Sequence, residues 1–384
     1  MSKRKMRFDT KVIHAGQPTP RIEGAVNVPI FQSSTFEYKG QKNYDDLVYV
    51  RLNNTPSHKS VSNKIAELEG ADQALVTSSG MSAITTTLLH FLKAGDHIIA
   101  HKNLYGGTAH FMQHGLPSYG IDVDFIDARD AKDWEEKIKP NTKVIYVETM
   151  TNPLVEVLEL DKIVEFANKN NLISIIDNTF ASPVIFCPIQ FGFDISLHSA
   201  TKYLNGHSDL AAGAIIGSSN HIKEISSTLN HLGGSLDPNT CYLLDRGIKT
   251  LSVRMERQCN NALKIANFLN SELYGKQTEI FWSVIFPKID NLTRHPSQIY
   301  EALFEGLILF LILNLLIRKN MLNKKGEITS YFLIFYSLFR FLLEFFREPD
   351  PQIGYLIIGM TMGQILCVFL FVIGIGLFFK KNEN

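Results

Sequence analysis

The sequence predicts an α/β protein built on a mostly parallel sheet, followed by an all-α segment embedded in a membrane. Two observations carry this prediction. Between residues 74 and 216, short runs rich in β-branched residues alternate with helical patterns, as in repeated strand-helix units. From Glu301 onward, Leu, Ile and Phe dominate instead. The chain therefore changes character toward its carboxyl end.

Five strands and two helices can be placed from these patterns. The strands are predicted at Ala74–Thr77, His97–Ala100, Val123–Ile126, Lys143–Val147 and Leu172–Ile176. The helices are predicted at Met81–Leu92 and Leu160–Asn168, where apolar residues recur with helical spacing. Alternation of the two types favours parallel strands, since each crossover needs a helix.

Three regions follow from these elements. Residues 1–60 contain the Gly-, Pro- and Asn-rich stretches GQPTPRIEG and RLNNTPS, which predict an extended arm. Residues 61–268 form the α/β domain, and residues 265–384 form the membrane-embedded part. Arms of this kind usually pack on a neighbouring subunit, so we expect a homo-oligomer.

Three apolar stretches predict about three transmembrane helices: Ala302–Ile317, Ile328–Phe346 and Tyr355–Phe379. Each lies near the roughly 17 to 25 residues that cross a bilayer. A single run of this length is more often a buried core helix. Three in succession with basic connectors favour membrane spans.

Composition excludes several classes of function. Lys plus Arg equals Asp plus Glu at 38 each, so the chain has no excess of positive charge. A nucleic-acid partner is therefore not indicated. The four cysteines lack metal-ligand spacing and suit a reducing compartment, so no metal site is expected. The basic terminus MSKRKMRFDT is followed by no apolar run and is not a secretory signal. We expect the first part to lie in the cytoplasm.

Four features, in chain order, match what a pyridoxal-phosphate (PLP) site needs. Ser78-Ser79-Gly80-Met81 stands where a strand turns into a helix and can hold a phosphate. Tyr105 can stack on the ring, and Asp177, closing the strand LISIID, can pair with the pyridine nitrogen. Ser199-Ala200-Thr201-Lys202 offers two hydroxyls beside an amine for the Schiff base. Taken singly, such residues are typical of caps, turns and surface lysines; together they indicate a cofactor.

Over about residues 8–268 the chain resembles the Cys/Met-metabolism family of PLP enzymes, which includes cystathionine γ-synthases, γ-lyases and β-lyases and methionine γ-lyases. The resemblance rests on the motifs TKVIHAG, VPIFQSSTF, YVR, SSGMSA, LYGGT, ETMTNP, DNTFASP and SATKYLNGHSD. It implies a fold-type I, aminotransferase-like PLP-dependent transferase domain. It also implies that Lys202 is the Schiff-base lysine and proton carrier, and that Tyr105 assists proton transfer.

The same resemblance assigns the other cofactor contacts. Gly80, Met81, Ser199 and Thr201 are implied to bind the phosphate, and Asp177 to pair with the ring nitrogen. The YVR motif implies that Tyr49 and Arg51 reach into the neighbouring subunit's phosphate site, which requires at least a dimer.

The resemblance implies trans-sulfuration chemistry, with γ-elimination or γ-replacement on cystathionine or homoserine-type amino acids. The motif DNTFASP is more similar to that of the γ-acting members than to that of the bacterial β-lyases. Gly107 stands where methionine γ-lyases usually carry a cysteine. Beyond Asn270 nothing resembles the family's carboxyl-terminal domain, which supplies an arginine for the substrate carboxylate. We therefore expect cofactor binding with impaired turnover.

Over about residues 265–384 the chain resembles bacterial prolipoprotein diacylglyceryl transferases, which use phosphatidylglycerol as lipid donor. The anchors are IANFLNSELYG, FWSVIFP, RHPSQIYEALFEG, YSLFRFLLEFFREPDPQIG and TMGQIL. The resemblance implies a catalytic Arg340 and a phospholipid site formed by Asn267, Glu272, Tyr336 and Arg340. Lys264 stands where that family carries a catalytic arginine, and the family's first four spans have no counterpart here.

Spacing supports a polar site in the second part independently. Tyr336, Arg340 and Glu344 follow one another at intervals of four, so they share one face of an apolar helix. Ionisable groups in a membrane span usually bind something in a polar interior, although an Arg-Glu pair can simply tie helices together.

Two alternatives to the trans-sulfuration reading thus stay open. One is a diacylglyceryl transferase of the bacterial inner membrane that carries a passenger domain. The other is a chimera with no unified activity, joined near residue 265 at a segment, NALKIANFLNSE, that fits both families. In either case the apolar helices are expected to attach the whole chain to the inner membrane.

Overall fold

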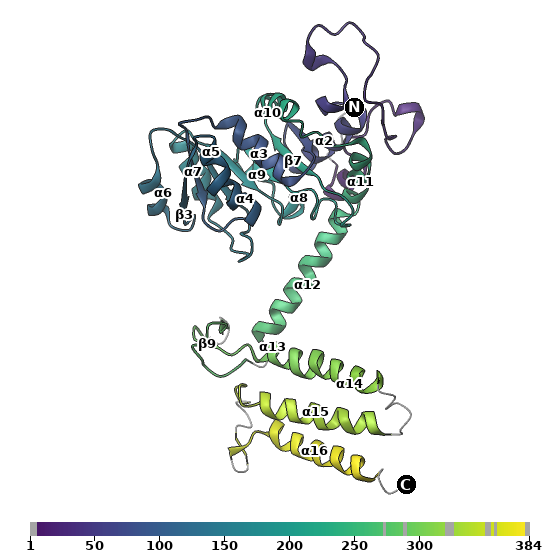
Figure 1. The fold of residues 1–384 in the computed structure, drawn as a ribbon, viewed down its shortest axis with the longest axis vertical. Coiled ribbons are helices and arrows are strands. Elements are labelled where there is room, and N and C mark those ends of the chain that lie inside the picture. The colour runs from purple at the N-terminus through teal and green to yellow at the C-terminus, as the bar shows by residue number, and fades with distance from the viewer. Residues whose placement is uncertain are drawn as a thin grey trace. The chain divides into compact units, whose positions relative to one another are not determined.

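The computed structural model describes residues 6–271, 274–286, 290–318, 326–349, 355–356 and 359–380. These residues fall into two compact units, residues 1–257 and residues 258–384. Figure 1 shows the elements of each unit. The long helix α12 (Leu251–Ser271) contributes residues to both.

The first unit is built on a seven-stranded sheet with the order β1-β7-β6-β5-β4-β2-β3. β7 is antiparallel to both of its neighbours, whereas the pairs among β2 to β6 are parallel. The strands are β1 (Gln73–Thr77), β2 (His97–His101), β3 (Asp122–Ile126), β4 (Thr142–Glu148), β5 (Ile173–Asp177), β6 (Ile195–His198) and β7 (Gly213–Gly217).

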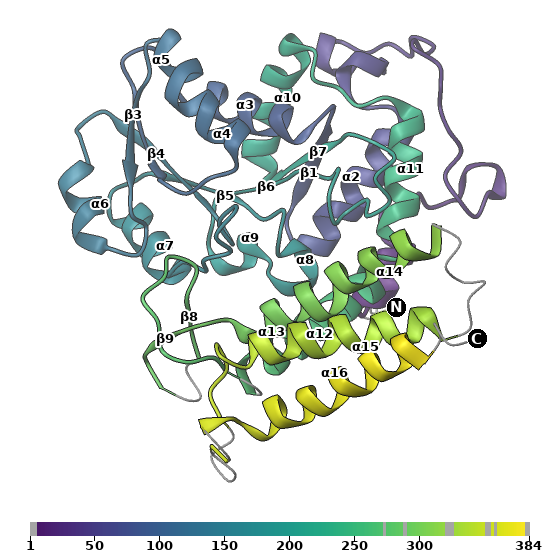
Figure 2. The same cartoon turned by 60° about the horizontal axis from the view of Figure 1, so that its bottom comes forward.

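Helices cover both faces of this sheet because the strands bury side chains on both sides. Alternate residues of β2 show the division, since Ile98 packs with α3 (Gly80–Phe91) and Ile99 with α7 (Leu160–Lys169). Figure 2 shows α3, α4 (Gly106–His110) and α10 (Ser219–Leu232) on one side of the sheet, and α7, α8 (Ser182–Ile185) and α9 (Pro188–Phe191) on the other. The result is a three-layer α/β/α unit.

The remaining elements of the first unit are short or lie near its ends. They are α1 (Phe8–His14), α2 (Pro56–Glu69), α5 (Leu116–Ser118), α6 (Ala131–Lys137), α8 (Ser182–Ile185), α9 (Pro188–Phe191) and α11 (Pro238–Ile248), with the single turns η1 (Ile22–Gly24), η2 (Tyr44–Asp46), η3 (Val50–Leu52) and η4 (Phe111–Gly115). Helix α1 anchors the amino-terminal region through Val12, which is buried in the core. Between α1 and α2 the described chain forms turns and irregular segments with mostly exposed side chains.

All five predicted strands and both predicted helices are present, with ends shifted by one residue at most. The prediction omitted β6 and β7. β6 is only four residues long and alternates apolar residues with Ser196 and His198, which is the pattern of a half-exposed strand although every side chain in it is buried. β7 begins and ends with glycine, which weakens any strand signal.

The second unit contains a short antiparallel pair of two-residue strands and several apolar helices. β8 (Val284–Ile285) pairs with β9 (Thr293–Arg294). One continuous helical stretch then comprises α13 (Ser297–Glu301), the π-helical turn η5 (Ala302–Ile308) and α14 (Leu309–Arg318), followed by α15 (Glu327–Leu343) and α16 (Met362–Lys380). Figure 1 shows α14, α15 and α16 side by side within this unit.

Two helices of the described chain are long and apolar enough to cross a membrane, at Ser297–Arg318 and Met362–Phe379. The second predicted span, Ile328–Phe346, corresponds to α15, which has 17 residues and falls just short of that length. Two such helices are by themselves weak evidence for membrane insertion. The expectation of three spans is therefore only partly supported.

A buried ion pair joins α2 to α11 in the first unit. Lys64 Nζ lies 2.6 Å from Asp245 Oδ1, and the Lys64 side chain is 1% exposed. Burial lowers the pKa of Lys64, and the neighbouring Asp245 carboxylate opposes that shift. Removal of the carboxylate would leave a buried ammonium group without its counter-ion.

We therefore expect Asp245→Asn to lower the free energy of unfolding by about 3 kcal/mol. The double variant Lys64→Met, Asp245→Leu should recover much of that loss, because it buries no charge. Calorimetry of the full-length chain in mild detergent would measure both. If Asp245→Asn melts at the same temperature as the wild type, the ion pair contributes nothing to stability.

Candidate active site

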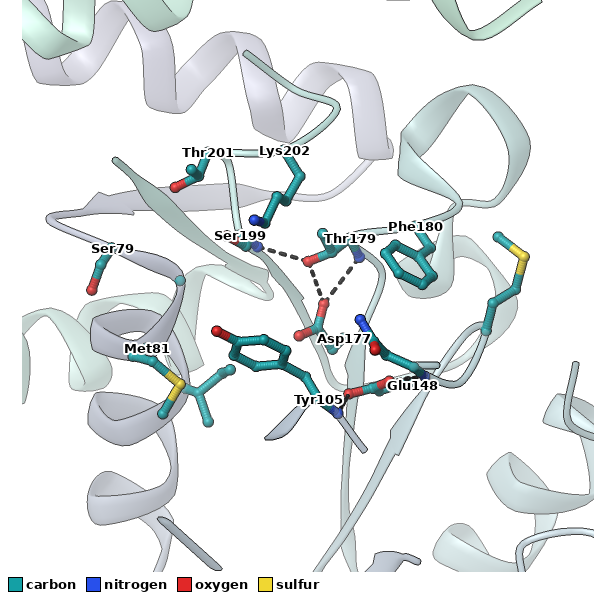
Figure 3. Close-up of a pocket in the computed structure, with 14 residues that line it drawn as sticks. Ser79, Met81, Tyr105, Glu148, Asp177, Thr179, Phe180, Ser199, Thr201 and Lys202 are labelled. Atoms are coloured by element: carbon teal, nitrogen blue, oxygen red, sulfur yellow. Dashed lines mark hydrogen bonds between the residues drawn. The ribbon is translucent and has the colours of Figure 1, made fainter. Parts of the chain in front are cut away.

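A cavity of about 420 Å³ opens at the carboxyl ends of β4, β5 and β6, where open α/β sheets generally bind ligands. It is lined by Ser79, Gly80, Met81, Ile84, Tyr105, Glu148, Met150, Asn152, Asp177, Thr179, Phe180, Ser199, Thr201 and Lys202. The residues assigned to the cofactor within one subunit are all among them, namely Gly80, Met81, Tyr105, Asp177, Ser199, Thr201 and Lys202, whereas Ser78 of the predicted phosphate turn is not. Figure 3 shows Lys202, Tyr105 and Asp177 converging on this one space.

The amino end of α3 forms an anion cradle on one side of the cavity. Ser79 caps the helix, its Oγ accepting from the Ser82 amide at 3.0 Å. A Cβ at Gly80 would lie 2.7 Å from Ser199 Cβ, so only glycine allows the helix end to approach the Ser199 loop this closely. The free amides and the helix dipole there favour a phosphate.

Asp177 lies at the end of β5 and is held by Thr179. The Asp177 Oδ1 atom accepts from the Thr179 amide at 3.0 Å and from its hydroxyl at 2.5 Å. The same Thr179 Oγ1 accepts from the Ser199 amide at 2.8 Å. Burial raises the pKa of Asp177, while the Thr179 hydrogen bonds and the nearby His198 lower it. A cationic ring nitrogen beside Asp177 would favour the carboxylate further.

Lys202 and Thr201 stand in the connection between β6 and β7. The Lys202 amide donates to the Ser199 carbonyl at 3.0 Å, which forms a tight turn. Thr201 Oγ1 accepts from the Ala212 amide at 3.0 Å, so that the turn is tied to the start of the next strand. These bonds fix the backbone from which the Lys202 side chain extends into the cavity.

Glu148 is a second carboxyl group in the cavity and was not among the predicted site residues. It lies opposite Asp177 in the β4–β5 register. Its Oε1 accepts from the Tyr105 amide at 2.7 Å and its Oε2 from the Asn152 amide at 3.1 Å. Burial, with repulsion from Asp177, raises the pKa of Glu148 to about 8. The signal for it was its position as first residue of the motif ETMTNP.

Thr179 and Asn152 were also missed as individual residues. Each stands inside a motif that supports the family resemblance, Thr179 in DNTFASP and Asn152 in ETMTNP. The sequence did not reveal where their side chains point. Thr179 turns toward Asp177 and Ser199, and Asn152 lines the cavity beside Glu148.

Tyr49 and Arg51 lie outside the cavity of their own chain. The Arg51 guanidinium stands over the Tyr49 ring at 5.4 Å from its centroid and hydrogen-bonds Tyr44 Oη. Its Nη1 donates to the Asn230 carbonyl at 3.0 Å. Their predicted role was in a neighbouring subunit's site, so this location leaves that prediction untested.

In the second unit, Arg340 of α15 is surrounded by carboxylates. Its Nη1 lies 2.5 Å from Glu301 Oε1 and 3.5 Å from Glu305 Oε1, and its Nη2 lies 3.4 Å from Glu344 Oε2. Thr361 also donates to Glu344, at 3.0 Å. One polar cluster among apolar side chains is thus formed by residues from three places: the helical stretch that precedes α14, helix α15, and the start of α16.

The other predicted phospholipid ligands are less well placed. Tyr336 lies one turn before Arg340 on α15, with its ring stacked on Phe332. Asn267 belongs to α12, but its side chain lies outside the described part of the structure, and so does Glu272 altogether. The structure therefore brings Tyr336 and Arg340 onto one helix and does not test the remaining two.

The residues present in the cavity fit PLP. The α3 end and the Ser199 turn form a cradle that a side chain at Gly80 would fill, which suits a phosphate. Lys202 supplies an amine for a Schiff base, Asp177 an anion for a ring nitrogen, and Tyr105 an aromatic face. Together, fold and cavity define a fold-type I PLP-dependent enzyme.

Comparisons with known proteins narrow the class. The family model described as "Cys/Met metabolism PLP-dependent enzyme" matches residues 9–321, and the chain belongs to that family. A probable cystathionine γ-synthase from Herpetosiphon aurantiacus is 41% identical over 292 residues, which cover 76% of this chain and 88% of that protein. An L-methionine γ-lyase from Porphyromonas gingivalis is 40% identical over 273 residues, covering 68% of each chain.

Two further relatives also act on sulfur amino acids according to their names. A cystathionine β-lyase from Lactococcus lactis is 40% identical over 303 residues and 78% of each chain. The crystal structure of cystathionine γ-lyase from Lactobacillus plantarum, complexed with L-serine, superposes with a TM-score of 0.66 at 38% identity over 71% of each chain. The chain is thus similar to lyases and synthases of sulfur amino acids.

The extent of the family match differs from the predicted extent. The resemblance was placed at about residues 8–268, whereas the matched region continues to residue 321, beyond α14. The findings give no support to the diacylglyceryl transferase resemblance.

Glu148 predicts a pH-dependent stability. In the folded cofactor-free chain this group keeps its proton up to a pH of about 8, whereas the unfolded chain releases it near its ordinary value of 4.5. Folding is therefore penalised increasingly as the pH rises from about 4.5 to about 8, by on the order of 5 kcal/mol in all, and no further above that.

We expect Glu148→Gln to remove most of this dependence, because an amide has no proton to release. Unfolding of the cofactor-free full-length chain at pH 5, 6.5 and 8 would measure the effect. Parallel pH profiles for wild type and variant would contradict the raised pKa.

Proposed function

We propose that this protein catalyses γ-elimination or γ-replacement on cystathionine or homoserine-type amino acids. The observation that carries the proposal is the convergence of Lys202, Asp177 and Tyr105 on one cavity beside an anion cradle. The relatives named above act on sulfur amino acids by their names, which supports the substrate class. A small amino acid is accordingly the proposed substrate.

Each cavity residue receives a role in this reaction. When bound, PLP withdraws electrons from the amino acid's Cα, so that its proton becomes acidic. We assign the Lys202 amine to take that proton and to return it, and the Tyr105 hydroxyl to assist the transfer. Asp177 keeps the ring nitrogen protonated. Gly80, Met81, Ser199 and Thr201 hold the phosphate.

The proposal includes a homo-oligomer. Tyr49 and Arg51 lie outside their own cavity but carry a guanidinium that suits a phosphate. We propose that they complete the phosphate site of a neighbouring copy. The exposed side chains of the amino-terminal region are consistent with an arm that packs on such a copy.

Space next to Tyr105 favours the synthase and cystathionine-lyase reactions over methionine γ-lysis. A Cβ at Gly107 would lie 2.8 Å from Tyr105 Cε1 and 3.2 Å from Met81 Sδ. A cysteine here would therefore displace the tyrosine ring from its present position. The glycine leaves the ring where it lies and leaves no thiol next to it.

Turnover is proposed to be weak. Lys202 is the only cationic side chain among the residues that line the cavity in the described chain, and no arginine is among them. A substrate carboxylate is best held by the two-pronged hydrogen bonds of a guanidinium. We propose that the cavity binds cofactor well and the amino-acid carboxylate poorly.

A visible absorbance band from lysine-bound cofactor is the expected mark of the site. Full-length chain purified with PLP should show it, and Lys202→Ala should lose it because no amine remains to bind the aldehyde. Lys249→Ala is the matched control, since Lys249 pairs with Asp245 away from the cavity. Equal bands in wild type and Lys202→Ala would refute the assignment.

For residues 265–384 we propose a second candidate function, attachment to the bacterial inner membrane and contact with phosphatidylglycerol. The observation that favours it is the Arg340 cluster, in which charged groups are kept among apolar helices. The first unit would then work on the cytoplasmic side. A cluster that only ties the helices together is the competing explanation, because the guanidinium already contacts three carboxylates.

A complementation assay separates these explanations. If the second unit acts as a diacylglyceryl transferase, the full-length gene should rescue a bacterial strain depleted of that enzyme. Arg340→Ala should abolish rescue, whereas Arg318→Ala, at the end of α14, should not. Absence of rescue by the unaltered gene would leave membrane attachment as the unit's proposed role and reject the transferase activity.

A further inference from the structure

Glu69 is a buried carboxyl group that lies outside the cavity. It is the last residue of α2 and is fully buried. Three side chains approach its Oε1 atom: His198 Nε2 at 2.6 Å, Asn178 Nδ2 at 3.2 Å and Ser196 Oγ at 3.3 Å. A carboxylate buried away from water is costly unless it is paired and hydrogen-bonded. Here the three side-chain partners offset that cost.

The groups that reach Glu69 adjoin the cofactor residues in the chain. Asn178 directly follows Asp177, and His198 directly precedes Ser199. Asn178 Oδ1 also accepts from the hydroxyl of Thr149, which directly follows Glu148. The ends of β4, β5 and β6 are thus linked through one hydrogen-bonded network that starts at α2.

The cavity side of the same strand ends has its own link. There, Thr179 joins Asp177 to the Ser199 amide, at 2.5 Å and 2.8 Å. Because successive residues of an extended strand point to opposite sides, Asn178 faces Glu69 while Asp177 and Thr179 face the cavity. The strand ends are therefore held from both sides.

The Glu69 network also has an electrostatic side. His198 Nδ1 and Glu69 Oε2 have no hydrogen-bond partner within the described chain. The imidazole is thus held on one nitrogen only, by the Glu69 carboxylate. His198 in turn lies close enough to Asp177 to favour the charged carboxylate there.

We infer that Glu69 and His198 are positioning residues for the cofactor: they fix the ends of β5 and β6 and so set the places of Asp177 and Ser199. The inference rests on the proposed function, since it names residues that support the same site. It predicts that a change at Glu69, buried outside the cavity, weakens cofactor binding and does more than lower stability.

The test uses the full-length chain in mild detergent, stripped of cofactor and titrated with PLP. For Glu69→Ala we expect the dissociation constant to rise about tenfold to a hundredfold, as when partners that orient metal ligands are removed. Glu69→Gln keeps an acceptor for His198 and should remain within about threefold of the wild type. The melting temperature with and without PLP would be recorded for each variant.

Asp245→Asn is the matched control. It also breaks a buried ion pair of α2, through Lys64, but at a place that does not line the cavity. It should lower the melting temperature with and without PLP alike and leave the PLP dissociation constant unchanged. Glu69→Ala should instead reduce the rise in melting temperature that PLP produces.

If Glu69→Ala does not fold, Asn178→Ala decides, because it removes one donor to Glu69 and leaves the pair with His198. It should raise the PLP dissociation constant as well. Wild-type affinity in a folded Glu69→Ala chain, or in Asn178→Ala, would overturn the inference alone. Failure of the unaltered chain to bind PLP would overturn the proposed function and the inference together.

Discussion

The cost of burying two carboxyl groups side by side governs the architecture of this site. Glu148 and Asp177 end neighbouring parallel strands and face one cavity, and burial raises the pKa of both carboxyl groups. Two amides hydrogen-bond to Glu148 and a threonine to Asp177. Even so, Glu148 retains a proton near neutral pH. The arrangement leaves one site for a cationic ring and one neutral acid beside it.

Most of the first unit could be predicted from its residues because its chemistry follows its strand ends. Asp177 and Lys202 could be assigned to one site because their motifs match, in chain order, what a PLP site needs, although the strand before Lys202 was not predicted. Contacts within one subunit followed directly. β6 and β7 were not predicted, because a short strand and a strand bounded by glycines give little periodic signal. The change from parallel to antiparallel pairing at β7 was not predicted either.

The residues that were missed share a different reason. Glu69 and Glu148 accept hydrogen bonds from groups far away in sequence, and Thr179 joins the neighbouring Asp177 to the more distant Ser199. No local pattern marks the distant partners. In the second unit the four-residue spacing did predict that Arg340 and Glu344 share a helix face. It could not predict Glu301 and Glu305, which come to Arg340 from another helical stretch.

The place of β7 in the sheet has a consequence for synthesis on the ribosome. β7 lies between β1 and β6 and is the last strand of the sheet to be made, so β1 has no partner in the sheet until residue 217 has emerged. The strands that end in Glu148 and Asp177 can pair earlier, as they neighbour one another in both sequence and space. The phosphate cradle, which follows β1, joins the lysine only at that final step. A nascent chain therefore cannot capture the cofactor in a half-built sheet.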